Sequence, residues 1–200
     1  VKQKGIDSSE AAGEKYDYSL KVVEGLLGRI KREEQPDVDI NEIYHTVDML
    51  TNQLILGDSL LESVTEEGVL EDYLPRHITN VCTLSLAVGM RMHFNKSKLH
   101  TLGMAALLHD IGMLRVEDIA KQPRKLSSDE TKKIKAHTWE CGKFLPEAEG
   151  HFNFIKEIIQ QHHERINGSG YPLGLKRNEI NEYAKIIGLV DTYEAMTHPR

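Results

Sequence analysis

Apolar residues recur at helical spacing along almost the whole chain, and this pattern leaves little room for any architecture other than packed helices. One of the clearest stripes is Ile40, Ile43, Val47, Leu50 and Leu54. Its spacing of three and four residues puts all five side chains on one face of a helix. Strict alternation of apolar and polar residues, which is typical of half-buried strands, is almost absent. We therefore predict an all-α fold.

Stop and start residues divide this pattern into separate helices. Pro36 is expected to end the first, and Asp39 to cap the second with Glu42 as its capping-box partner. Others are expected over about 97–111, from Ser127 or Ser128 onward, around 155–163, and over about 180–197. We expect the last to bury Ala184, Ile187, Val190 and Ala195.

A polar connection predicts a division of the chain near residue 68. Residues 1–68 would then form an N-terminal helical hairpin with a regulatory or packing role. Residues 69–200 would form a compact catalytic helical body. A length of 200 residues is ample for one hydrophobic core of this kind.

Charge and cysteine content exclude several classes of protein. The 31 acidic residues outnumber 25 basic ones, for a net charge of −6. This balance argues against non-specific DNA, RNA or anionic-membrane binding, which needs excess cations. Cys82 and Cys141 lie in apolar stretches and are too few for a disulfide framework. Because no apolar run approaches the roughly 20 residues that span a bilayer, we expect a cytoplasmic protein without a membrane segment here.

Seven ionisable side chains occupy helix positions where the apolar pattern calls for Leu or Ile. They are His77, His109, Asp110, His137, His162, His163 and Asp191. One such residue is more often a hydrogen-bonded core residue than a ligand, but burying each without a partner costs about 2–7 kcal/mol. Seven are explained together if they converge on metal ions, which favour imidazole and carboxylate ligands.

The remaining histidines lie among polar residues or at helix ends, so we expect them at the surface or in caps. They are His45, His93, His100, His151 and His198.

Around residues 109–112 (HDIG) the sequence resembles the HD superfamily of metal-dependent phosphohydrolases. That superfamily combines a His, a His-Asp doublet and a distant Asp, matched here by His77, His109-Asp110 and Asp191. Residues 162–172 (HHERINGSGYP) are similar to the signature of the HD-GYP subfamily, and residues 190–197 resemble its next block. The resemblance runs from about residue 72 to the end. It implies an HD-domain helical bundle after the N-terminal hairpin, truncated at its C-terminus.

The resemblance also implies a site with two divalent metal ions, iron being favoured over manganese, zinc and nickel. One ion would be held by His77, His109, Asp110 and Asp191, and the second by His137, His162, His163 and a bridging Asp110. Some family members hold a third metal with a Glu, at a place where this chain has Tyr73. Asp110 and His109 would serve catalysis by supporting a hydroxide between the two ions.

The implied activity is that of bacterial signalling phosphodiesterases, which open a cyclic dinucleotide, cyclic di-GMP first, to a linear one. Gly168 and Gly170 would let a loop approach the site, while Tyr171 and Pro172 shape its rim. Glu164 would either orient a ligand histidine or be a solvated charge, and the sequence leaves both roles open.

Two departures from the family pattern affect this expectation. Met113 stands where the family usually has a Lys that touches a substrate phosphate, and Asn167 where it favours Asp. Candidate replacements for the missing cation are Arg115 first, then Lys121, Arg124 and Lys125.

Met113 keeps an alternative function open. In it the chain is a metal-bound module with little or no turnover, which binds a cyclic dinucleotide or a partner such as a diguanylate cyclase domain. A generic HD phosphohydrolase is disfavoured by the additional histidines and the GYP loop. A sensory domain and a homodimer are further partners that the resemblance suggests.

Overall fold

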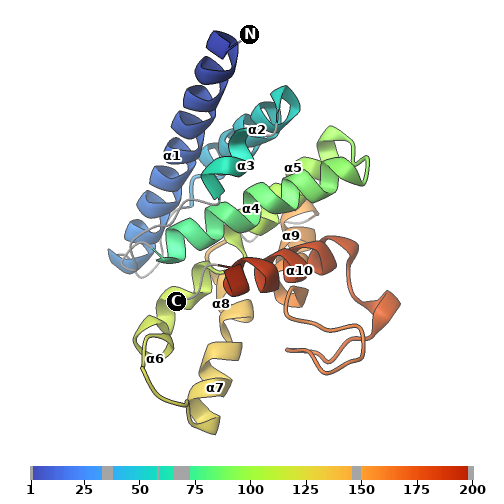
Figure 1. Ribbon diagram of the computed structural model, residues 1–200. Coiled ribbons are helices and arrows are strands. Elements are labelled where there is room, and N and C mark those ends of the chain that lie inside the picture. The colour runs from blue at the N-terminus through green and yellow to red at the C-terminus, as the bar shows by residue number, and fades with distance from the viewer. Residues whose placement is uncertain (1, 33–37, 58, 65–72, 146–149, 198–200) are drawn as a thin grey trace.

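The computed structural model of the protein describes residues 2–32, 38–57, 59–64, 73–145 and 150–197, with side chains from residue 11 onward (Figure 1). Within these ranges all regular elements are helices, and the one extended pairing is an isolated bridge between Asn167 and Lys176. The all-α prediction is confirmed.

The elements follow one another as α1 (Lys2–Arg32), α2 (Ile40–Leu56), α3 (Ser59–Val64), α4 (Tyr73–Arg91), α5 (Lys96–Leu108), the 3-10 helix η2 (Ile111–Arg115), α6 (Glu117–Ala120), α7 (Ser128–Lys135), α8 (His137–Lys143), α9 (His151–Gln161), the 3-10 helix η3 (Arg177–Glu179) and α10 (Glu182–Thr197).

Helix α1 packs against α2, α3 and α4 (Figure 1). Asp39 caps α2 as expected, since its Oδ1 accepts hydrogen bonds from the backbone amides of Asn41 and Glu42. The capping-box role of Glu42 is wrong, because its carboxylate pairs at 3.0 Å with Arg29 of α1. The expected helix end at Pro36 and the boundary near residue 68 lie outside the described residues.

Helix α5 is the central element of the body. From Leu99 to Leu108 all its side chains are buried, because α2, α4, α9 and α10 pack around it. A helix that is apolar on every side is buried in the protein. Residues that directly follow such a helix therefore begin inside the protein. His109 is the C-cap of α5 and therefore lies in the middle of the molecule.

Five of the seven polar core residues lie at or just beyond helix ends rather than within helices: His109, Asp110, His137, His162 and His163. The helix expected over 97–111 ends at Leu108, so Asp110 stands in a turn before η2. Helix α7 starts after Ser127, one of the two predicted positions, which forms a capping box with Glu130, and His137 opens the next helix, α8. His162 is the C-cap of α9. The ends of these helices meet beside His77 of α4 and Asp191 of α10.

Gly112 allows two of these helix ends to meet. A Cβ atom at this position would overlap the carbonyl oxygen of His137, since η2 runs directly against the start of α8. The glycine that follows the His-Asp doublet is therefore required by packing.

Candidate metal centre

The structure brings all seven predicted residues together, in two adjacent groups. We call Asp110, His137, His162 and His163 the Asp110 cluster, and His77, His109 and Asp191 the His77 cluster. Within each group, one potential ligand atom from every residue lies within 4.8 Å of the others. Apart from His163, whose side chain is 18% exposed, the residues of both clusters are buried.

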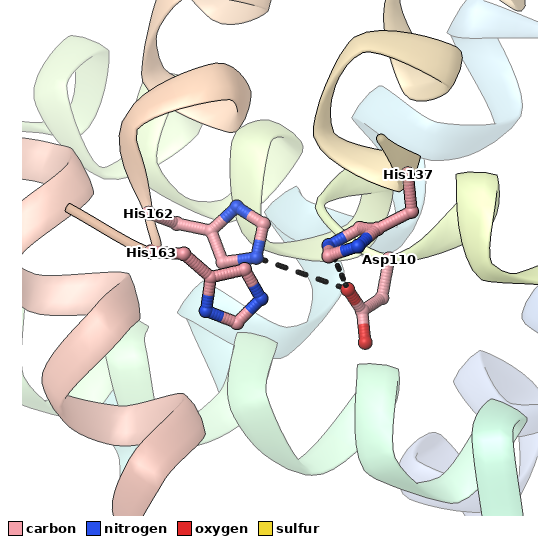
Figure 2. Close-up of side chains that lie close together, drawn as sticks. All are labelled: Asp110, His137, His162 and His163. Carbon is pink, nitrogen blue, oxygen red and sulfur yellow. Dashed lines mark ion pairs between the residues drawn. The ribbon is translucent and has the colours of Figure 1, made fainter. Parts of the chain in front are cut away.

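Asp110 lies between the two clusters and faces both. Its Oδ1 is 3.2 Å from Nε2 of His137 and 3.8 Å from Nε2 of His162 (Figure 2). Its Oδ2 is 3.6 Å from Nε2 of His77 and 3.8 Å from Nε2 of His109. One carboxylate thus presents a separate oxygen to each half of the site.

Asp191 connects the two halves a second time. Its Oδ1 lies 3.3 Å from Nε2 of His77, and its Oδ2 lies 3.7 Å from Nδ1 of His163. Burial raises the pKa of Asp191, but the contact with His77 and the charges of His109 and His162 together outweigh this effect and the pKa is lowered. Two carboxylates therefore join five imidazoles into one site.

Three of the histidine rings are oriented by their own helices, through Nδ1 and the carbonyl three residues earlier. The pairs are His109 with Ala106 at 2.8 Å, His137 with Ile134 at 2.6 Å, and His162 with Ile159 at 2.6 Å. Because a carbonyl can only accept, Nδ1 carries the proton and Nε2 keeps its lone pair. This is the arrangement that metal-bound histidines usually have.

The Nε2 atoms of four histidines are buried and have no hydrogen-bond partner among the described residues, and neither does Oδ1 of Asp110. The four are His77, His109, His137 and His162. A buried acceptor left unpaired costs about 1–3 kcal/mol. A divalent cation between these atoms would satisfy all of them, so the donor set fits a metal.

Electrostatics in the Asp110 cluster favour neutral His162 and His163 beside an ionised carboxylate, whereas the contact of His137 with Asp110 outweighs burial and raises the pKa of His137. Burial lowers the pKa of His162 well below its ordinary value, and it lowers the pKa of His163 to about 3. Burial works in the opposite direction on Asp110, but the charges of His109 and His137 outweigh it and hold the pKa of this carboxyl well below its usual range. Neutral imidazole and carboxylate are the forms that bind metal ions.

The ring of His77 is oriented by side chains and not by a carbonyl of its own helix, and the sequence pattern does not predict these side chains. The Nδ1 atom of His77 contacts Oε2 of Glu194, and Asn80 donates to the other oxygen of Glu194 at 2.9 Å. The hydroxyl of Tyr16 donates to Oδ1 of Asn80 at 2.6 Å. Burial opposes a charge on His77, but Asp191 and Glu194 outweigh it and raise the pKa well above the ordinary value.

A signal for Glu194 was present in the sequence. It follows Asp191 by three residues and therefore lies on the same side of α10. The apolar pattern predicts that Ala195 lies on the buried side of this helix, but Ala195 is exposed and Glu194 is 1% exposed. The prediction for Ala195 is wrong because the buried side of α10 at this point is polar.

Both cysteines are free and buried, as expected. Cys141 lies directly behind the site, where its thiol donates to the carbonyl of His109 at 3.0 Å. Burial raises the pKa of this thiol well above its usual range, so it supports the turn at His109 as a neutral donor.

Glu164 anchors the glycine-rich loop. This role differs from the two that were expected, orienting a ligand histidine or being a solvated charge. The side chain is buried, and its Oε1 accepts from the backbone amides of Leu173 at 2.6 Å and Gly174 at 3.0 Å. Its Oε2 accepts from the amide of Leu175 at 3.0 Å. The loop is thus bound to the residue that follows the His162-His163 pair.

Gly170 and Tyr171 place the loop beside the Asp110 cluster. A Cβ atom on Gly170 would overlap the backbone of Glu164 and Arg165, so the close return of the loop requires glycine. The Tyr171 ring lies 4.7 Å from the ring of His163, centroid to centroid. Gly168 and Pro172 are half-buried in the same loop.

Three of the four candidate cations predicted to replace the missing lysine contact other groups. Met113 itself is buried. Arg115 lies over the ring of Phe144 at 5.4 Å, Lys121 pairs with Glu117 at 2.6 Å, and Arg124 pairs with Glu130 at 2.7 Å. Lys135 is not among the predicted replacements, and its Nζ lies 5.0 Å from the centroid of the Tyr171 ring.

Of the five histidines expected outside the site, three follow the expectation, one does not, and one is not described. His45, His93 and His151 are exposed, and His198 lies outside the described residues. His100 is buried; its Nε2 is 3.2 Å from Asp48 and its ring stacks on Tyr44. Its surface assignment is wrong because α2 covers this face of α5.

None of the helices in the described ranges is long and apolar enough to span a membrane.

Comparison with known proteins places the chain in a family. The HD domain family matches residues 64–200. The chain is 28% identical over 164 residues to cyclic di-GMP phosphodiesterase PA4108 of Pseudomonas aeruginosa, a match that covers 82% of this chain and 40% of that protein. It is 31% identical over 153 residues to 3′3′-cGAMP-specific phosphodiesterase 3 of Vibrio cholerae, with 74% of this chain and 33% of that protein covered.

A solved structure has the same fold. Bd1817, an HDG"Y"P protein from Bdellovibrio bacteriovorus, superposes with a TM-score of 0.69 at 20% identity, covering 95% of this chain and 61% of that chain. Together with the family match, these likenesses lead to one conclusion: the chain belongs to the HD domain family, and its HD and GYP residues follow the pattern that the HD-GYP subfamily has.

Proposed function

We propose that the protein is a metal-dependent phosphodiesterase that opens a cyclic dinucleotide, cyclic di-GMP first, to a linear dinucleotide. The observation that carries this proposal is the set of buried, partnerless nitrogen lone pairs around Asp110. The names of the relatives from P. aeruginosa and V. cholerae support the substrate class. Since the chain spans only 40% and 33% of these relatives, the activity of the whole protein is part of the proposal.

Two ions would be held, one by the His77 cluster with Asp110 and the other by the Asp110 cluster. Imidazole and carboxylate donors without thiolate suit iron, manganese, zinc and nickel, and we favour iron. When bound, such a pair lowers the pKa of water toward neutrality and neutralises charge on the phosphoryl oxygens.

The chain's own residues would give this chemistry its position. Asp110 presents one oxygen to each cluster, so it fixes where the reacting phosphodiester meets both. His109 is held by its contact with the Ala106 carbonyl and keeps its Nε2 aimed inward. Because these groups are already oriented before the substrate arrives, little reorganisation is needed during the reaction.

The substrate would enter on the side of the GYP loop. His163 is the most exposed member of either cluster, and Tyr171 lies against it. A cyclic dinucleotide has two phosphodiester groups, so one can lie at the metal site while the other meets a cation at the rim. Lys135 is exposed, lies over Tyr171, and pairs with no carboxylate of the described chain. We assign the rim contact to Lys135 ahead of Arg115.

A second candidate function is the metal-bound module with little turnover. It is favoured by Met113, which is buried and uncharged where the family has a lysine. In either case residues 1–68 would act as a regulatory hairpin on the catalytic body at 69–200.

One experiment separates the two functions. The protein is purified without oxygen, its metals are counted, and it is incubated with cyclic di-GMP and with 3′3′-cGAMP. We expect two metals per chain and a linear dinucleotide product. Full metal loading with no cleavage of either nucleotide would instead establish the binding module.

A further inference from the structure

A buried chain of hydrogen bonds leads from α1, outside the catalytic body, to the His77 cluster. It runs from the Tyr16 hydroxyl to Asn80 at 2.6 Å, from Asn80 to Glu194 at 2.9 Å, and from Glu194 to Nδ1 of His77. Tyr16, Asn80 and Glu194 are at most 3% exposed. This series of hydrogen bonds joins α1, α4 and α10, which are far apart in sequence.

The chemistry of these groups allows one arrangement. A carboxylate only accepts hydrogen bonds, so Asn80 must turn its amide nitrogen toward Glu194 and its carbonyl oxygen toward Tyr16. The Tyr16 hydroxyl must then donate. Burial raises the pKa of Tyr16 to about 12, against a smaller lowering by Arg76 nearby, so the hydroxyl keeps its proton at neutral pH.

His77 depends on this arrangement more than the other histidines of the site do. His109, His137 and His162 are each held by a carbonyl of their own helix. The Nδ1 atom of His77 instead contacts Glu194, which lies on another helix. Anything that turns Glu194 therefore turns the ring whose Nε2 faces Asp110 and Asp191.

We propose that Glu194 is a positioning residue for His77, and that Tyr16 of α1 controls the metal affinity of the His77 cluster through Asn80. A displacement of α1 would remove the Tyr16 hydroxyl, free the Asn80 amide to rotate, and loosen His77. The N-terminal helix thereby regulates one half of the metal centre and leaves the Asp110 cluster unchanged. This inference rests on the proposed metal centre, although it does not require phosphodiesterase activity.

The test measures metal binding without substrate. Chelator-treated protein is titrated with Mn²⁺, and electron paramagnetic resonance follows both free Mn²⁺ and the spin coupling of a bound pair. The variants are Glu194→Ala, Tyr16→Phe and the two combined. Tyr18→Phe is the matched control, since it removes a hydroxyl from an exposed position of the same helix.

We expect Glu194→Ala to weaken one of the two Mn²⁺ sites by about 10- to 100-fold and to abolish the coupled signal at limiting metal. Tyr16→Phe, which keeps the buried ring, should weaken the same site by about two- to tenfold, the value of one hydrogen bond. Tyr18→Phe should bind as the wild type does. In the Glu194→Ala background, Tyr16→Phe should have no further effect.

Two results would overturn the inference: Tyr16→Phe binding both ions with wild-type affinity, or Tyr16→Phe weakening binding equally with and without Glu194. Thermal unfolding of the metal-free variants separates a folding defect from a local one, and Tyr16→Phe decides the matter if Glu194→Ala does not fold. A wild type that binds two Mn²⁺ but cleaves no cyclic dinucleotide overturns the proposed function and leaves this inference standing.

Discussion

The two halves of the metal centre differ in what surrounds them. The Asp110 cluster faces the GYP loop, and its His163 is partly exposed beneath Tyr171. The His77 cluster faces the N-terminal helix, and its His77 is held through Glu194 and Asn80 by Tyr16. We propose that the first half meets the substrate and that the second responds to the N-terminal helix. Asp110 lies between the two halves and presents one oxygen to each.

The largest effect is expected from substitution of Asp110, which faces both halves of the site. Asp110→Ala removes the oxygens that face both clusters, so we expect both metals and all measurable activity to be lost. The loss of metal affinity should exceed the roughly 10- to 100-fold that removal of an outer partner costs. Metal analysis after dialysis measures it. Retention of two metals per chain by this variant would contradict the bridging position.

His162→Ala should affect only one half. The side chain belongs to the Asp110 cluster and is 0% exposed. We expect one metal to be lost, one to remain in the His77 cluster, and hydrolysis of cyclic di-GMP to cease. His100→Ala is the control, since it removes a buried histidine that pairs with Asp48 away from the site. Activity that survives His162→Ala would show that the ligand assignment is wrong.

Gly170→Ala tests the substrate side of the comparison. The added Cβ would overlap the backbone of Glu164 and Arg165, and the loop must move to relieve it. We expect a loss of stability of about 1–3 kcal/mol, typical of overpacking, and a higher KM with unchanged metal content. Gly142→Ala is the matched control, because its Cβ would meet only Lys156 atoms at 4.0 Å. An unchanged KM for Gly170→Ala would remove the loop from substrate binding.

The smallest effect is expected at the rim. Lys135→Ala should raise KM for cyclic di-GMP by up to about fivefold, as exposed charge contacts usually contribute no more than about 1 kcal/mol. The number of bound metals and kcat should stay the same. Lys132→Ala, which removes a cation from the same helix that pairs with Asp129, should leave KM unchanged. Equal effects of the two substitutions would indicate a general charge effect, not a contact.

The part of the site that the sequence could predict is the part that depends on local spacing. Helical periodicity identifies which residues of one helix share a face, and it singled out His77, His109 and Asp191 because they interrupt apolar stripes. The orientation of His109 is local too, since its partner is three residues away. The GYP resemblance predicts Tyr171 at the rim of the site, only eight residues after His163 in the sequence.

The remaining features depend on contacts between residues that are distant in sequence. Tyr16 and Asn80 are 64 positions apart, and Asn80 and Glu194 are 114 apart. No spacing rule relates such residues until the helices are packed. His100 was misplaced for this reason, since its partner Asp48 lies on a helix that the periodicity could not dock. The partners of Glu164 lie in an irregular loop, where periodicity gives no information.

The central claim is that Asp110 joins two metal ions held by two clusters, and anomalous diffraction from crystals of the metal-loaded protein tests it directly. We predict two peaks about 3.5–4 Å apart, one on each side of Asp110, each about 2 Å from histidine Nε2 atoms. A single peak, or a peak bound without any contact to Asp110, would contradict the account.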